Sequence, residues 1–171
     1  AASYELQLED LRMTSIENAS MVLLNFTLQF VPDEERLPIL KRIADGMLPG
    51  GVLLLAEKVR FDSEPEQNLM IELHHDFKRY QGYSDLEIAQ KRSALENVLV
   101  PNTGAEHIER LASAGFTSQQ QCVRCLNFEA FLAISTSIWA AGLIERSLDL
   151  LEIRYLYPHT RISNYQSFLE T

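Results

Sequence analysis

The chain alternates between continuous apolar runs and segments whose apolar residues recur every three or four positions. Ser20 to Phe26 and Val52 to Leu55 are continuous runs, which are typical of parallel strands covered on both faces. Between them, Asp33 to Met47 carries apolar residues at helical spacing. A strand, a helix and a second strand in this order predict one βαβ unit of a parallel sheet.

Further elements flank this unit. The segment from Tyr4 to Leu8 alternates and predicts a short strand that ends at Asp10. After the βαβ unit we expect three helices and then two antiparallel strands, at residues 66–80, 85–99, 103–114, 116–126 and 128–134. Gly82 separates the first two helices, and Ser84 is the expected N-cap of the second. The pattern predicts an α/β fold with a helical insertion between two strands.

The character of the sequence changes near the end of the chain. Residues 1–134 read as part of one α/β domain, with the helical insertion at about 66–99 as a cover over the site. In residues 135–171, Ile144, Leu148 and Leu151 form a helical stripe. We expect an extra helical tail there, whose role the sequence does not indicate.

Ligands of open parallel sheets bind at the carboxyl ends of the strands. Asn25 lies at one such end, and Asp10 closes the short strand before it. No glycine-rich cofactor loop precedes this unit, and the first residue is Ala rather than Met. We therefore expect a fragment that holds only part of a nucleotide site.

Composition narrows the classes of partner. The formal net charge is −9, which disfavours direct contact with the phosphate backbone of nucleic acids but not a small anion in a local basic pocket. No apolar run approaches the length of a membrane span. Cys122 and Cys125 fall in a predicted strand, where residues three apart point to opposite faces, so we expect neither a redox pair nor a metal site. Low cysteine use favours a reducing cytoplasm.

His74, His75 and Asp76 suggest a metal site at first sight. Adjacent residues on a helix point roughly 100° apart, so the three side chains cannot easily converge on one ion. We predict no metal.

Several stretches resemble a known family. They are residues 16–30, 49–58, 74–79, 82–84 and 90–98. The second of them occurs in many methyltransferases. The His74–Arg79 and Gln90–Val98 stretches are more specific, and together the stretches resemble carboxy-S-adenosyl-L-methionine synthases over about residues 4–134.

The resemblance implies an incomplete Rossmann-like, class I S-adenosylmethionine-dependent methyltransferase fold. It also implies a cytoplasmic homodimer without metal that converts S-adenosylmethionine and prephenate to carboxy-S-adenosylmethionine and phenylpyruvate, for modification of the wobble uridine of tRNA. The methyl carbon, deprotonated to an ylide, captures the carbon dioxide released by prephenate. Because that carbanion is strongly basic, a helical cover that excludes water has a chemical purpose.

The resemblance also assigns cofactor contacts. Asp10 and Leu11 correspond to the pair that flanks the adenine, where a carboxylate accepts from the exocyclic amine and a backbone N–H meets a ring nitrogen. Asn25 corresponds to the residue beside the methionine part. In this family, therefore, these three residues would bind S-adenosylmethionine.

Arg92 corresponds to the catalytic arginine that meets the new carboxylate, reaching from the partner subunit. Arginine suits this role because its planar fork binds a carboxylate through two hydrogen bonds. Tyr83 and His75 are the residues that we expect to line the prephenate pocket. Without the resemblance, Arg92 beside Lys91 would pass as a solvated helix residue.

The chain also departs from the family. The glycine-rich loop and the acidic ribose ligand are missing, Glu9 stands where glycine is usual, and Met13 where an acidic residue is common. We therefore expect weak or no cofactor binding by this chain alone. Two alternatives stay open: a non-catalytic dimerisation module, and a methyltransferase that acts on a small molecule.

Overall fold

The computed structural model describes residues 5–96, 98–135 and 153–156. They form one five-stranded mixed sheet in the order β3-β4-β2-β1-β5. Its strands are β1 (Ala19–Asn25), β2 (Met47–Lys58), β3 (Ser118–Cys125), β4 (Phe128–Ile134) and β5 (Ile153–Leu156). The helices are η1 (Leu28–Phe30), α1 (Asp33–Gly46), α2 (Glu64–Tyr80), α3 (Asp85–Leu95) and α4 (Gly104–Ser113).

The predicted βαβ unit is confirmed. β1 and β2 are parallel neighbours joined by η1 and α1, and Asn25 lies opposite Ala56. The predicted closing pair is also confirmed, because β4 runs antiparallel to both β2 and β3. Cys122 and Cys125 are exposed free thiols of β3.

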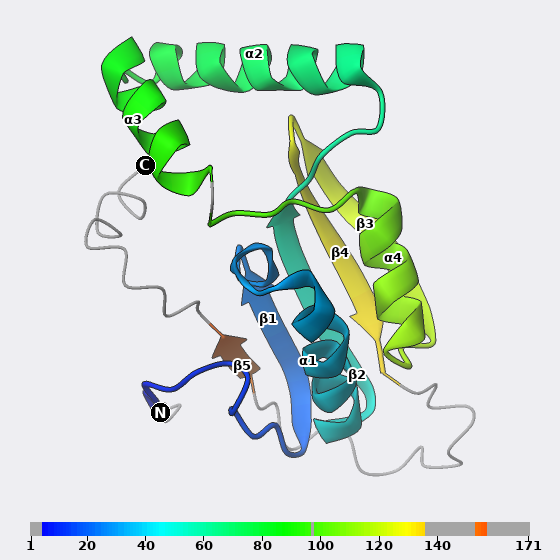
Figure 1. The fold of residues 1–171 in the computed structure, drawn as a ribbon. Coiled ribbons are helices and arrows are strands. Elements are labelled where there is room, and N and C mark those ends of the chain that lie inside the picture. Colours follow the sequence, from blue (N-terminus) through cyan, green and yellow to red (C-terminus); the bar gives the residue numbers. More distant parts are fainter. Residues whose placement is uncertain (1–4, 97, 136–152, 157–171) are drawn as a thin grey trace.

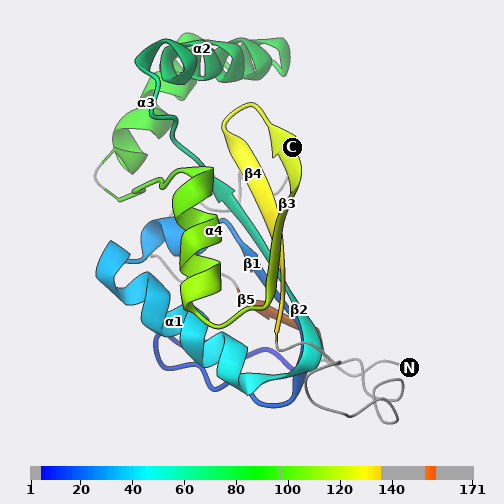
Figure 2. The ribbon, with the colours of Figure 1, turned by 90° about the vertical axis from the view of Figure 1, so that its right-hand side faces the viewer.

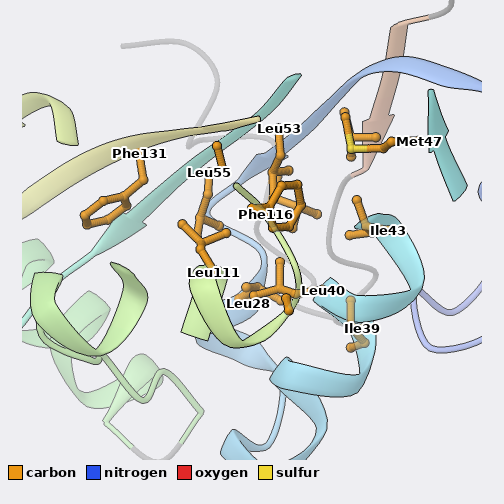
Figure 3. Packing of buried hydrophobic residues seen from close by; sticks show 14 of the residues in the cluster. Leu28, Ile39, Leu40, Ile43, Met47, Leu53, Leu55, Leu111, Phe116 and Phe131 are labelled. Carbon is orange, nitrogen blue, oxygen red and sulfur yellow. The ribbon is translucent and has the colours of Figure 1, made fainter. Parts of the chain in front are cut away.

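One face of the sheet carries the core. α1 and α4 lie side by side over that face (Figures 1 and 2). Leu53 and Leu55 of β2 point towards them and are fully buried, whereas the alternate residues Val52 and Leu54 are only half-buried. Figure 3 shows the side chains of α1, such as Leu40 and Ile43, packed against this face.

The boundaries of α1 differ slightly from the prediction. Pro32 rather than Asp33 occupies the N-cap position, so Asp33 is the first helical residue. The helix ends at Gly46, where only glycine fits because a side chain would overlap the backbone carbonyl of Ile16. The buried face also includes Arg36, whose fully buried guanidinium donates to the carbonyls of Val31 and Val100, both at 2.9 Å.

The predicted strand at residues 4–8 is wrong for the described residues 5–8. Residues 5–10 have no regular secondary structure, and the side chains of Leu6 and Leu8 are 89% and 83% exposed. The sheet edge beside β1 is paired instead with β5, which runs parallel to it. A strand needs a partner for its backbone groups, and here that partner position is already filled.

In the tail, Ile153–Leu156 is a strand rather than a helix. The predicted helical stripe at Ile144, Leu148 and Leu151 lies outside the described residues. Within the part of the chain that the structure describes, no helix is both long and apolar enough to cross a membrane.

The predicted insertion forms two helices that extend beyond the carboxyl ends of β1 and β2 (Figure 1). The start of α3 is the predicted Ser84 cap, and Ser84 and Glu87 form a reciprocal capping box. We call α2 and α3 together the helical arm. No residue of α2 is fully buried, so the arm projects from the sheet instead of packing flat on it.

Candidate functional site

The candidate site lies at the carboxyl ends of β1 and β2, as the βαβ pattern predicted. Asn25 is the last residue of β1 and is half-buried. Phe26 follows in a left-handed conformation with φ 52°, and its N–H donates to the carbonyl of Ala56 at 2.7 Å. This bend turns the chain sharply away from the sheet immediately after Asn25.

Glu57 holds the loop after Asn25 in place. Its buried carboxylate accepts hydrogen bonds from the backbone N–H groups of Thr27, Leu28 and Gln29, at 3.1, 2.8 and 3.2 Å. Burial raises the pKa of Glu57 to about 7, although these three hydrogen bonds oppose the rise. Glu57 was not among the residues predicted for the site. Its place at the end of a buried strand is the signal that could have identified it.

The raised pKa of Glu57 predicts a pH-dependent stability. The carboxyl group of Glu57 releases its proton near pH 4.5 in the unfolded chain and near pH 7 in the folded chain. Its contribution to the free energy of unfolding therefore falls by about 3 kcal/mol as pH rises across that window. His74 and His107 act in the opposite direction, because burial lowers the pKa of each to about 4. The effect of Glu57 must therefore be measured against a Glu57→Gln variant.

The measurement is urea denaturation of both proteins at about pH 4.5 and about pH 7.5. We expect the stability of the unsubstituted chain, relative to Glu57→Gln, to be lower at the higher pH. A difference in stability that is the same at both pH values would contradict a raised pKa.

An aromatic bridge connects the sheet to the helical arm. The ring of Phe128, in β4, lies 5.6 Å from that of Phe26 and 5.1 Å from that of His74, both edge-on. Phe128 also lies opposite Lys58, the last residue of β2. The bridge places α2 against the carboxyl ends of the strands.

The structure brings Arg92 to the same end of the sheet as Asn25. Arg92 is exposed in the last turn of α3. Burial lowers the pKa of Lys58 and that of His75, and the charge of Arg92 adds to the lowering of each. Asn25 pairs with Ala56 of the neighbouring strand β2, and Ala56 lies two residues before Lys58.

His75 and Tyr83, which we predicted to line the prephenate pocket, contact residues of the helical arm. His75 is half-buried on α2, and its ring lies 6.4 Å from that of His74. Tyr83 follows Gly82, and the ammonium of Lys91 lies 4.8 Å above its ring. His74, for which we predicted no metal, contacts the sheet through the ring of Phe128.

Asp10 and Leu11 lie against α1. The Arg12 guanidinium hydrogen-bonds the carboxylate of Asp10 and holds the pKa of Asp10 at about 2. The carbonyl of Leu11 accepts from Arg42 of α1 at 2.7 Å. Within the described residues, the hydrogen bonds of Asp10 are made with Arg12, Met13 and Thr14, which follow it directly in the chain.

A separate groove lies between the start of α4 and strands β3 and β4. It has a volume of about 540 Å³, and Arg60, Arg124 and Glu129 are among its lining residues. Its cations are already ion-paired: Arg60 with Glu106 at 2.6 Å, and Arg124 with Glu66 at 2.7 Å. None of the residues predicted for the site lines this groove.

No model of a known protein family matches the chain. Individual curated proteins do. A carboxy-S-adenosyl-L-methionine synthase of Marinobacter nauticus is 55% identical over 132 residues, which are 77% of this chain and 53% of that protein. One of Geobacter sp. strain M21 is 56% identical over 124 residues, 72% of this chain and 51% of that protein. The chain thus spans about half the length of the curated relatives it matches, and the predicted resemblance is confirmed.

Solved structures support the fold. Human N-acetylserotonin methyltransferase, solved in complex with S-adenosylmethionine, has a TM-score of 0.52 at 21% identity and covers 79% of this chain and 36% of its own. An O-methyltransferase family 2 protein of Planctomyces limnophilus has a TM-score of 0.51 at 18% identity. The match covers 75% of this chain and 33% of that protein. At such identities the likeness concerns the fold alone. The predicted partial methyltransferase fold is confirmed.

Proposed function

We propose that this chain, a homologue of the carboxy-S-adenosyl-L-methionine synthases over about half of their length, forms the substrate-facing part of an enzyme of that kind. The observation that carries the proposal is the identity of 55% over 132 residues, which include the helical arm. The carboxyl end of β1 supports it, because Asn25 and the cations of the arm lie at the same end of the sheet.

The proposed reaction joins S-adenosylmethionine and prephenate. Prephenate loses its ring carboxyl group as carbon dioxide and its hydroxyl group as hydroxide, which leaves phenylpyruvate. The hydroxide takes a proton from the methyl carbon of S-adenosylmethionine and leaves as water, and the methyl carbon bonds to carbon dioxide. Atoms and charges then balance without a metal or a redox partner. The product would serve wobble-uridine modification of tRNA in the cytoplasm.

In this proposal Asn25 binds the methionine part of S-adenosylmethionine, and Asp10 with Leu11 flanks its adenine. His75 and Tyr83 line the prephenate pocket, and Arg92 binds the new carboxylate. The carboxylate of Asp10 is paired with Arg12 and exposed, so the adenine amine would share it with that guanidinium. Because no glycine-rich loop is present in the sequence, we propose that the chain alone binds S-adenosylmethionine weakly or not at all.

We further propose that the chain forms a homodimer through the helical arm. Leu69, Leu73, Phe77 and Tyr80 recur at helical spacing on α2, and each is 40% or more exposed. Four large apolar side chains on one helix face are costly to leave in water. A second copy of the arm can cover them.

The test is a chimera that joins this chain to the amino-terminal half of the Marinobacter nauticus relative. We expect the chimera, with S-adenosylmethionine and prephenate, to yield a cofactor heavier by one carbon dioxide in mass spectrometry. The chain alone should yield little or none.

A chimera that folds and binds S-adenosylmethionine without this mass gain would contradict the proposal. Consumption of S-adenosylmethionine with methylation of a small molecule would favour the methyltransferase alternative. A dimer that binds neither compound would favour the non-catalytic module.

A further inference from the structure

Cations from three elements lie near the aromatic bridge: Lys58 is opposite Phe128 in the sheet, and Lys78 follows by one helical turn His74, whose ring packs on Phe128. We call Lys58 of β2, Lys78 of α2 and Arg92 of α3 the cationic cluster. Lys58 and Lys78 are half-buried, and Arg92 is exposed. Lys58 is held at this position by its backbone, since its N–H donates to the buried Gln29 side chain at 3.0 Å.

The members of the cluster repel one another. Burial lowers the pKa of Lys58, and the charge of Arg92 lowers it further. Burial also lowers the pKa of Lys78, followed by the charges of Lys91 and Lys58. Each lysine is therefore destabilised as a cation in the free chain, both by partial loss of water and by its neighbours.

No carboxylate offsets this repulsion among residues 5–96, 98–135 and 153–156. No ion pair within these residues includes a member of the cationic cluster, although the whole chain carries a net charge of −9. Arg79, one residue after Lys78, shows the contrast, because it pairs with Asp76 at 2.6 Å and with Asp85 at 2.8 Å. Partly buried cations that lie near one another without a carboxylate partner form a candidate site for an anion.

The surroundings indicate what kind of anion fits. Phe128 lies opposite Lys58 in the sheet, and its ring packs edge-on against Phe26 and His74. Burial lowers the pKa of His74 to about 4, so this imidazole is neutral near pH 7 and forms part of an uncharged aromatic surface. A ligand with a flat apolar ring and more than one carboxylate would satisfy both the surface and the cations.

We propose that Lys58 and Lys78 bind a carboxylate of a ring-bearing dicarboxylate substrate, next to the carboxylate assigned to Arg92. This inference rests on the proposed function for the identity of the substrate, prephenate. It adds two residues of this chain as determinants of specificity for a dianion over a monoanion. Because all of the cluster lies in this chain, binding does not require the cofactor.

The test is isothermal titration calorimetry of the 171-residue chain with two probes. Prephenate carries two carboxylates, and phenylpyruvate carries one. We expect prephenate to bind at least about tenfold more tightly, and each of Lys58→Met and Lys78→Met to remove most of that preference. Methionine keeps a long apolar stem, so the packing of the half-buried lysine side chain is largely retained.

The matched control is Lys41→Met, which removes an exposed lysine on α1 and should leave both affinities unchanged. Thermal unfolding gives a second measurement, and a purely structural role of the lysines would not produce the result that we expect. Lys58→Met and Lys78→Met should raise the melting temperature of the free chain, because each removes a repelled cation.

Three results would overturn the inference. They are no binding of prephenate by the unsubstituted chain, equal binding of both probes, and full prephenate affinity in both lysine variants. If prephenate binding depends on the lysines and the chimera nevertheless produces no carboxylated cofactor, the anion site is correct and the proposed reaction is wrong. The two proposals can thus fail separately.

Discussion

Replacing Arg92 with alanine is expected to lower the affinity of the chimeric enzyme for carboxy-S-adenosylmethionine by about 100-fold. Two charge-assisted hydrogen bonds to one carboxylate are worth about 3 kcal/mol together, which corresponds to that factor. The affinity for S-adenosylmethionine should change little, because that compound lacks the added carboxylate. Calorimetric titration of both compounds measures the difference.

Two controls distinguish this role from a general effect of charge. Arg92→Lys keeps the charge and loses the planar fork, so it should restore only part of the affinity. Arg79→Ala removes an arginine that is already paired with Asp76 and Asp85, and it should leave product affinity unchanged. If Arg92→Ala leaves the affinity for carboxy-S-adenosylmethionine unchanged, Arg92 does not bind the added carboxylate.

Leu73→Asp is expected to convert the proposed homodimer into a monomer. Leu73 lies in the middle of the apolar stripe on α2, and a carboxylate there would have to be buried without a partner when two arms meet. We expect the dissociation constant of the dimer to rise by at least about 100-fold, since burial of an unpaired charge costs several kcal/mol. Size-exclusion chromatography with light scattering measures the oligomeric state.

The matched control is Asn68→Asp, which places the same charge on the same helix, roughly 140° around from Leu73 and away from the stripe. This variant should remain dimeric. If the unsubstituted chain is itself monomeric at the concentrations tested, the proposal of a dimer through the arm is wrong. If Leu73→Asp is monomeric and the corresponding chimera stays fully active, Arg92 does not act across the interface.

The sequence predicted the elements that depend on local order. Ser84 begins α3 because a serine followed three residues later by Glu87 can satisfy the free N–H groups of a helix start. The run from Met21 to Leu24 forms a strand inside the sheet because it is apolar at every position, and the apolar periodicity of residues 33–47 predicted α1.

The candidate site was only partly predictable. Asn25 could be located because the end of a buried parallel strand is visible in the pattern. The role of Arg92 came from a resemblance, since nothing in its local pattern separates it from a solvated arginine. Glu57 and Lys58 were missed because their importance depends on residues about thirty positions earlier, such as Gln29, and on helices later in the chain.

By itself, the sequence determined the parallel unit, the closing antiparallel pair and the helical insertion, because hydrophobic periodicity and capping act over a few residues. Only the tertiary structure decided that residues 5–10 do not join the sheet and that β5 pairs with β1. It also brought Lys58 and Lys78, from a strand and a helix, close enough for the charge of Lys58 to add to the lowering of the Lys78 pKa by burial and by Lys91. Strand partners and charge neighbours are chosen across long stretches of chain, where burial and electrostatic energy depend on the assembled fold rather than on local order.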